Sequence, residues 1–249
     1  SLVRVGDDSV AKYPGLTIKG GTFTQDNFIV IKVDRGDLFL NGGTLNSANS
    51  YAIENWFRAS IKGGTVNGNV AAWTYSKGSN STLTISGGTV NGNVESVSYD
   101  GSTGKKASVS ITGGTVNGTL STIRYDNMTV PGKDMATIEI TGGTIEAVGG
   151  EGAAGIGGGV YGSGRDIEIS GGKVSAMGGS YSGPEEDPRP GAAGIGDGAG
   201  AWSEIAPDAP PSNPNHIIIS GDAEVEAKAG ASTGGKTAAI GGGIVGEIP

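Results

Sequence analysis

Residues 85–94 read Ile-Ser-Gly-Gly-Thr-Val-Asn-Gly-Asn-Val, and residues 111–120 read Ile-Thr-Gly-Gly-Thr-Val-Asn-Gly-Thr-Leu. A third near-copy, Ile-Lys-Gly-Gly-Thr-Val-Asn-Gly-Asn-Val, occupies residues 61–70. The rest of the 249-residue chain can be read as looser copies, because the first Gly of a pair recurs at positions 20, 42, 63, 87, 113, 142 and 171, with a degenerate copy at 221. Repeats of this length, built from short β-prone runs, are typical of a solenoid.

Each repeat predicts three short strands. An alternating run such as Leu83-Thr84-Ile85 precedes the Gly pair, with aliphatic side chains inward and polar ones outward. The Gly pair is expected to turn the corner, because Gly readily adopts positive φ. A second strand follows, and a third begins after Asn-Gly at Val70, Val94 or Leu120. The fold class is therefore all-β: a right-handed parallel β-helix of about eight coils, spaced ~4.8 Å apart.

The C-terminal third departs from this unit. Gly-Ala-Ala-Gly-Ile-Gly occurs at residues 152–157 and again at 191–196, so we expect Gly and Ala to pack one side of the coil around a single Ile. Residues 180–215 are rich in Pro and acidic side chains and are predicted to form a long inserted loop. Residues 1–249 are treated as one domain, because a repeat protein grows by adding units.

Composition restricts the partners. The formal net charge of −8 argues against nucleic acid and anionic membranes, which require a basic surface. The absence of Cys removes disulfides and thiolate sites, and Cys-free, Gly-rich chains favour the cell exterior. No signal peptide or membrane span is apparent, and the chain begins and ends in repeat-like sequence. We expect a part of a larger multidomain protein, without a cofactor.

The Ile-x-Ile-x-Gly-Gly-Thr-Val repeats and the Gly-Ala-Ala-Gly-Ile-Gly segments resemble the right-handed parallel β-helix repeats of Gram-positive bacterial surface proteins, within the pectin-lyase-like superfold. The resemblance extends from about Leu16 to Gly243. It implies an extracellular or cell-surface location in a bacterium. It implies no particular activity, because that superfold includes lyases, hydrolases, adhesins and sugar-binding modules.

Tyr residues stand twelve positions after the first Gly in three successive repeats. Stacked coils would turn them into a ladder. A buried ladder would only pack, whereas an exposed one would offer flat rings to a pyranose chain. Trp73 stands two positions before the first Tyr, and charged residues flank the other two. The candidate ligand-binding residues are Tyr75, Tyr99, Tyr125, Trp73, Asp100, Arg124 and Asp126.

No catalytic residue is predicted. A pectin-type hydrolase would show paired Asp, Gly-His-Gly and Arg-x-Lys, but the one His, His216, stands at the start of a strand and is assigned a structural or solvent role. Two groups of charged residues suggest either a solvated edge, or a weak cation site or the polar rim of a sugar groove. They are Asp34 and Asp37 with Arg35, and Asp100 and Asp126 with Arg124. The acidic run 185–187 with Asp197 and Asp208 matches no calcium motif, so no metal site is predicted.

Two polar columns follow the Gly pairs. The Thr column includes Thr65, Thr89 and Thr115. A flat array of Thr can order water, as in ice-binding solenoids, but those usually have two Thr columns. The single column here therefore argues against ice binding. The Asn column, Asn67, Asn91 and Asn117, is predicted to form a side-chain amide ladder that closes the corner and satisfies backbone groups.

Taken together, these features predict a non-catalytic extracellular module for adhesion or carbohydrate binding, with a polysaccharide or host glycan along the Tyr face. One alternative is a polysaccharide lyase or glycoside hydrolase that uses Asp100, Arg124 and Asp126. Another is a spacer that presents a second domain.

Overall fold

The computed structural model describes residues 1–7, 13–74, 79–98, 105–124, 136–160, 162, 164, 166–182, 191–199, 217–232 and 237–241. Their regular structure is entirely β, and no described segment is a helix long and apolar enough to cross a membrane. The strands are β1 (Val3–Val5), β2 (Gly15–Thr24), β3 (Ile31–Val33), β4 (Asp37–Asn55), β5 (Arg58–Ile61), β6 (Thr65–Thr74), β7 (Ser81–Asn91), β8 (Val94–Ser98), β9 (Ala107–Asn117), β10 (Leu120–Arg124), β11 (Ala136–Val148), β12 (Ile156–Gly157), β13 (Ile167–Met177), β14 (Ile195–Gly196), β15 (Ile217–Ile219), β16 (Glu224–Lys228) and β17 (Ile240–Gly241).

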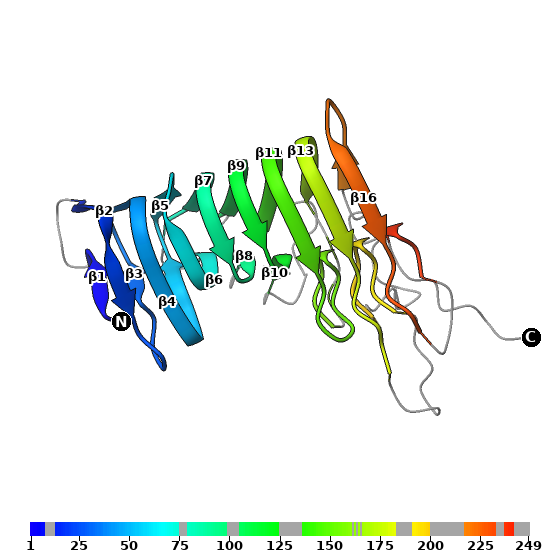
Figure 1. Ribbon diagram of the computed structural model, residues 1–249, viewed down its shortest axis with the longest axis horizontal. Coiled ribbons are helices and arrows are strands. Elements are labelled where there is room, and N and C mark those ends of the chain that lie inside the picture. Colours follow the sequence, from blue (N-terminus) through cyan, green and yellow to red (C-terminus); the bar gives the residue numbers. More distant parts are fainter. Residues whose placement is uncertain are drawn as a thin grey trace, which may run out of the picture.

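Equivalent strands of successive repeats pair in parallel, so each repeat forms one rung of a stack. Figure 1 shows the rungs following one another in sequence order, from β1, β2 and β3 at one end to β16 at the other. In the first column Ile61 pairs with Ile85, which pairs with Ile111. In the second column Val66 pairs with Val90, which pairs with Val116. The predicted conversion of sequence spacing into spatial columns is confirmed at these positions.

Most Gly pairs lie inside strands and do not end them, whereas Gly63–Gly64 separates β5 from β6. β7, β9, β11 and β13 each run through their pair as one bent strand, with a shift in register there. The second Gly has positive φ, for example 78° at Gly88. A Cβ on Gly88 would lie 2.7 Å from the Gly64 carbonyl oxygen of the neighbouring rung. The prediction of a Gly corner that separates two strands is therefore confirmed at Gly63–Gly64 and wrong at the pairs in β7, β9, β11 and β13, where the bend is made within one strand.

The third column runs through the Gly- and Ala-rich segments of the C-terminal third. Leu120 pairs with Ile156, which pairs with Ile195, and Ile195 pairs with Ile240. Ile156 and Ile195 are fully buried, with Ala154 buried near Ile156 in sequence and Ala192 and Ala193 buried near Ile195, as predicted for a side packed around a single Ile. Within the predicted loop 180–215, Ile195–Gly196 form β14 of this column, whereas residues 183–190 and 200–215 lie outside the described part of the chain.

The core consists of the inward Val, Ile and Leu side chains of the three columns. Leu40, Ile61, Ile85, Ile111 and Ile140 are fully buried at equivalent positions. A single rung would leave its inward side chains exposed above and below, so the burial of these side chains requires neighbouring rungs.

Candidate functional site

The clearest candidate site lies at the Asn-Gly corner between the second and third columns. Gly68 and Gly92 occupy equivalent positions there, and Gly68 has a φ of 138°. A Cβ on Gly92 would lie 2.3 Å from the Gly68 carbonyl oxygen. Only Gly fits at this spacing, so the corner has a floor without side chains.

One row of amides stands on the second-column side of this floor. Asn67 Nδ2 donates to Asn46 Oδ1 (2.8 Å), and Asn91 Nδ2 donates to Asn67 Oδ1 (2.8 Å). Asn117 Nδ2 donates to Asn91 Oδ1 (2.9 Å) and extends the row. The predicted ladder is confirmed, but these hydrogen bonds join side chains to one another and do not satisfy backbone groups. Asn46 was missed, although it follows Gly43 at the same interval as Asn67 follows Gly64.

A second row stands on the third-column side, and it does cap the backbone. Asn69 Oδ1 accepts a hydrogen bond from Asn93 N (3.0 Å), and Asn93 Oδ1 accepts one from Thr119 N (3.2 Å). These bonds use the carbonyl half of each amide and fix its orientation. Asn69 thereby presents its NH₂ group from a rigid position.

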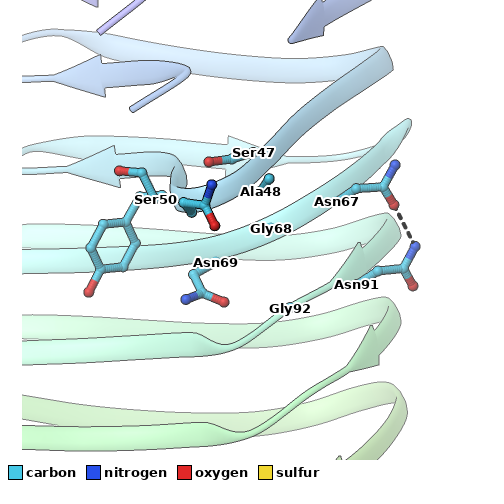
Figure 2. A pocket seen from close by; sticks show the side chains of 10 residues that line it. Ser47, Ala48, Ser50, Asn67, Gly68, Asn69, Asn91 and Gly92 are labelled. Carbon is cyan, nitrogen blue, oxygen red and sulfur yellow. Dashed lines mark hydrogen bonds between the residues drawn. The ribbon is translucent and has the colours of Figure 1, made fainter. Parts of the chain in front are cut away.

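An open groove of about 700 Å³ lies over this corner. Figure 2 shows side chains of three successive rungs meeting there, with Ser47, Ala48 and Ser50 on the first, Asn67 to Asn69 on the second, and Asn91 and Gly92 on the third. Every residue that lines it is uncharged: Ser47, Ala48, Asn49, Ser50, Tyr51, Asn67, Gly68, Asn69, Asn91 and Gly92.

A difference in corner length creates the groove. Asn46 aligns with Asn67 and Ile53 with Val70, so the seven-position step from 46 to 53 lies against a three-position step from 67 to 70. The preceding rung supports the longer corner, because Asn49 N donates a hydrogen bond to Asp26 O (3.0 Å). The groove is the step down from this long corner to the short ones. Sequence reasoning missed it, although the four extra residues were a visible signal.

Tyr51 joins the groove to a buried acid. Its hydroxyl donates to Glu95 Oε2 (2.6 Å), two rungs away. The intervening position holds Ala71, which is fully buried, and its small side chain leaves room for the ring. Burial raises the pKa of Glu95, and the hydrogen bond from Tyr51 partly offsets this rise.

Trp73, one of the predicted ligand-binding residues, is half-buried in an aromatic cluster. Its ring lies 6.3 Å from that of Tyr51 at 89° and 5.8 Å from that of Trp56 at 19°. Trp56 Nε1 in turn donates to Glu54 Oε1 (2.7 Å), and Lys32 Nζ lies 5.4 Å from the Trp56 ring. Trp73 therefore contributes packing that holds Tyr51 beside the groove.

Most of the other predicted binding residues lie outside the described part of the chain. Tyr75, Tyr99, Tyr125, Asp100 and Asp126 lie outside the described residues, and Arg124 is described by its backbone alone. The positions before the Tyr column do stack, because Thr74 pairs with Ser98 and Ser98 with Arg124. The ladder itself stays a prediction.

The acidic candidates near the N-terminus form separate ion pairs. Asp34 contacts Arg4 and lies 3.6 Å from Lys32 Nζ, whereas Asp37 accepts from Arg58 Nη2 (2.9 Å). Arg35 lies 5.5 Å from the Tyr13 ring centroid. Both carboxylates are therefore already engaged by cations.

The remaining acidic and His candidates form no metal site within the described residues. Asp197 Oδ1 accepts a hydrogen bond from Gly164 N (2.8 Å), whereas His216, residues 185–187 and Asp208 lie outside the described ranges. Within those ranges, no three His, Cys, Asp or Glu side chains are placed to hold a metal ion.

Comparison with known proteins supports the repeat alone. Residues 138–160 and 167–199 match the family model described as a β-helix repeat. No curated protein and no solved structure matches the chain. The matched segments contain most of β11 and all of β12, β13 and β14, so this part of the stack is similar to a β-helix repeat.

Proposed function

We propose that this chain is a non-catalytic module that binds carbohydrate or mediates adhesion at a bacterial cell surface. Its scaffold would be a right-handed parallel β-helix of about eight coils, related to the surface-protein repeats of the pectin-lyase-like superfold. The uncharged, amide-lined groove at the Asn-Gly corner is the observation that carries this proposal.

The chemistry of the groove suits a sugar. Amide and hydroxyl groups supply both donors and acceptors, as a polyhydroxylated ligand requires. The two Asn rows are fixed by hydrogen bonds along the stack, so little side-chain entropy is lost on binding. Tyr51 adds an aromatic surface at one end.

The predicted Tyr75, Tyr99 and Tyr125 ladder is a second candidate surface, with Asp100, Arg124 and Asp126 at its edge. The in-register stacking of Thr74 on Ser98 supports its alignment. Extracellular location and attachment to further domains belong to the proposal too, supported by the resemblance of the repeats and the absence of Cys.

A charge-matched pair of variants tests the groove. Asn69→Asp keeps an oxygen that accepts from Asn93 N but replaces the NH₂ group with a negatively charged oxygen. We expect about tenfold weaker glycan binding, equivalent to one lost hydrogen bond, with little change in thermal midpoint. Asn41→Asp adds the same charge at an exposed position outside the groove and should bind like wild type.

The alternatives give different outcomes in the same experiment. Release of reducing or unsaturated ends from polysaccharide would support a hydrolase or lyase and contradict a non-catalytic module. Absence of binding to any glycan would favour the spacer. Equal loss of binding in both variants would mean that the added negative charge weakens binding wherever it lies. The groove would then not be the binding site.

A further inference from the structure

Tyr51 is the aromatic side chain among the described residues that line the groove. Its backbone is in register with Asn69 of the next rung. The side chain extends along the stack, because the hydroxyl group donates a hydrogen bond to Glu95 Oε2 (2.6 Å), and Glu95 belongs to the rung after that of Asn69. The Tyr51 side chain therefore spans one whole rung at the side of the groove.

Three features determine where the Tyr51 ring lies. Ala71, on the rung that the ring crosses, is fully buried, and its small side chain leaves room for the ring. Trp73, on the same rung, meets the ring edge-on, with 6.3 Å between the ring centroids and an interplanar angle of 89°. Glu95 accepts the hydrogen bond at the far end. The apolar contacts are weakly directional, so the hydrogen bond is what fixes the direction of the side chain.

The same hydrogen bond decides what Tyr51 offers to a ligand. A phenol has one O–H donor, and that of Tyr51 is used by Glu95. A sugar in the groove therefore meets the surface of the ring and not its donor. The C–H bonds on the face of a pyranose suit the negative face of an aromatic ring, and the hydroxyl groups around the sugar can then bond to amides such as that of Asn69.

Glu95 reduces the stability of the folded chain at neutral pH. It is half-buried, and burial raises its pKa in spite of the hydrogen bond from Tyr51. Its register neighbours are Ala71 and Ser121, so the fold itself requires no acid at this position. A destabilising side chain that contacts a binding surface is best explained by a function at that surface.

From these contacts we propose that Glu95 is a positioning residue for carbohydrate: it holds the Tyr51 ring beside the groove, and a pyranose unit stacks on this ring through its C–H face. This inference rests on the proposed function. It adds the residue that stacks on the sugar, the residue that positions it and the face of the sugar that is bound.

The test begins with an array of linear glucans, xylans, mannans and galactans, which identifies the hexasaccharide that wild type binds most tightly. Calorimetry with this hexasaccharide then compares variants of the pair. Tyr51→Ala removes the stacking surface, and we expect at least about tenfold weaker binding. Glu95→Ala removes the acceptor and should weaken binding about fivefold. Glu95→Gln retains an acceptor and should bind like wild type.

A double-mutant cycle separates positioning from a structural role. Tyr51→Phe keeps the ring but loses the hydrogen bond, so its affinity should match that of Glu95→Ala. A protein with both substitutions should bind no more weakly than either single variant. This double variant also leaves no half-buried acid without its donor, so it keeps the test valid if Tyr51→Phe alone folds poorly. Glu139→Ala, at an exposed position of β11 outside the groove, is the control and should bind like wild type.

Three results would overturn the inference while the carbohydrate-binding proposal stood. They are unchanged affinity in Tyr51→Ala, equal losses of affinity in Glu95→Gln and Glu95→Ala, and additive losses in the double variant, which would mean that Glu95 acts independently of Tyr51. Failure of every oligosaccharide to bind wild type would reject both proposals.

Discussion

Glu95 illustrates how one side chain depends on residues far away in the sequence. It points outward from β8, where an acid would ordinarily be solvated. Tyr51 covers it from two rungs away and donates a hydrogen bond to it. Burial disfavours the carboxylate more than the hydrogen bond favours it, so the pKa of Glu95 rises above its ordinary value of 4.5.

This shift predicts the pH dependence of a variant. Because the folded state holds the Glu95 proton more tightly than the unfolded chain, protonated Glu95 contributes stability that is full below pH 4.5 and lost as pH rises through the raised pKa. Glu95→Gln stays neutral and can still accept from Tyr51. We expect it to unfold at a higher temperature than wild type at neutral pH and at an equal temperature below pH 4.5.

Thermal unfolding followed by circular dichroism across this pH range measures the difference. Glu139→Gln is the control, because Glu139 is an exposed outward residue of β11, and its curve should follow wild type. A Glu95→Gln protein less stable than wild type at neutral pH would mean that the Tyr51–carboxylate bond outweighs burial.

At the scale of the element, most of the Gly pairs allow a strand to bend while its ladder continues. The first Gly of a pair needs space because the rung below approaches closely. A Cβ on Gly87 would lie 2.5 Å from the Lys62 carbonyl oxygen, and the equivalent Cβ on Gly20 would meet nothing within 4 Å. The same repeat position is therefore restricted in the middle of the stack and unrestricted on β2.

Gly87→Ala and Gly20→Ala should accordingly differ in stability. Gly87→Ala forces a backbone contact apart, and we expect it to lower the free energy of unfolding by about 1–3 kcal/mol, the usual cost of overpacking. Gly20→Ala should be neutral or stabilising by up to about 1 kcal/mol, because it restricts the unfolded chain. Urea denaturation measures the free energy of unfolding of both variants. Similar losses of stability would show that backbone entropy, and not the close approach of neighbouring rungs, determines the cost of the substitution.

At the scale of the whole molecule, stability is shared between neighbouring rungs. Ile111 and Ile219 belong to one column, but Ile111 is fully buried and Ile219 is 40% exposed. β9 pairs with rungs on both sides, whereas β15 pairs with β13 alone among the described strands. In a stack of this kind the interfaces between rungs supply much of the free energy.

Replacement of each Ile by Ala measures this distribution. Ile111→Ala should cost about 2–5 kcal/mol, as for other core truncations, because both neighbouring rungs keep the cavity open. Ile219→Ala should cost less than about 1 kcal/mol. Native-state hydrogen exchange should show the amides of β9 protected more strongly than those of β15. Equal costs at the two positions would contradict a stack stabilised rung by rung.

Much of this architecture was predictable because the repeat converts local spacing into tertiary contact. Once Ile85 and Ile111 share a repeat position, parallel pairing places one above the other, and the same reasoning predicts the Asn67, Asn91 and Asn117 ladder. The path through the Gly pair was not predictable in this way, because positive φ permits either a corner or a bend within a strand.

The sequence by itself determined which residues share a column, because a repeat with a constant interior must stack in register. Only the tertiary structure decided where the groove lies and how its wall is held. The groove forms where a long corner meets a short one, and Tyr51 reaches Glu95 across forty-four positions of sequence. Neither property belongs to a single repeat: both arise from differences between neighbouring rungs, which become visible only when the rungs are placed side by side.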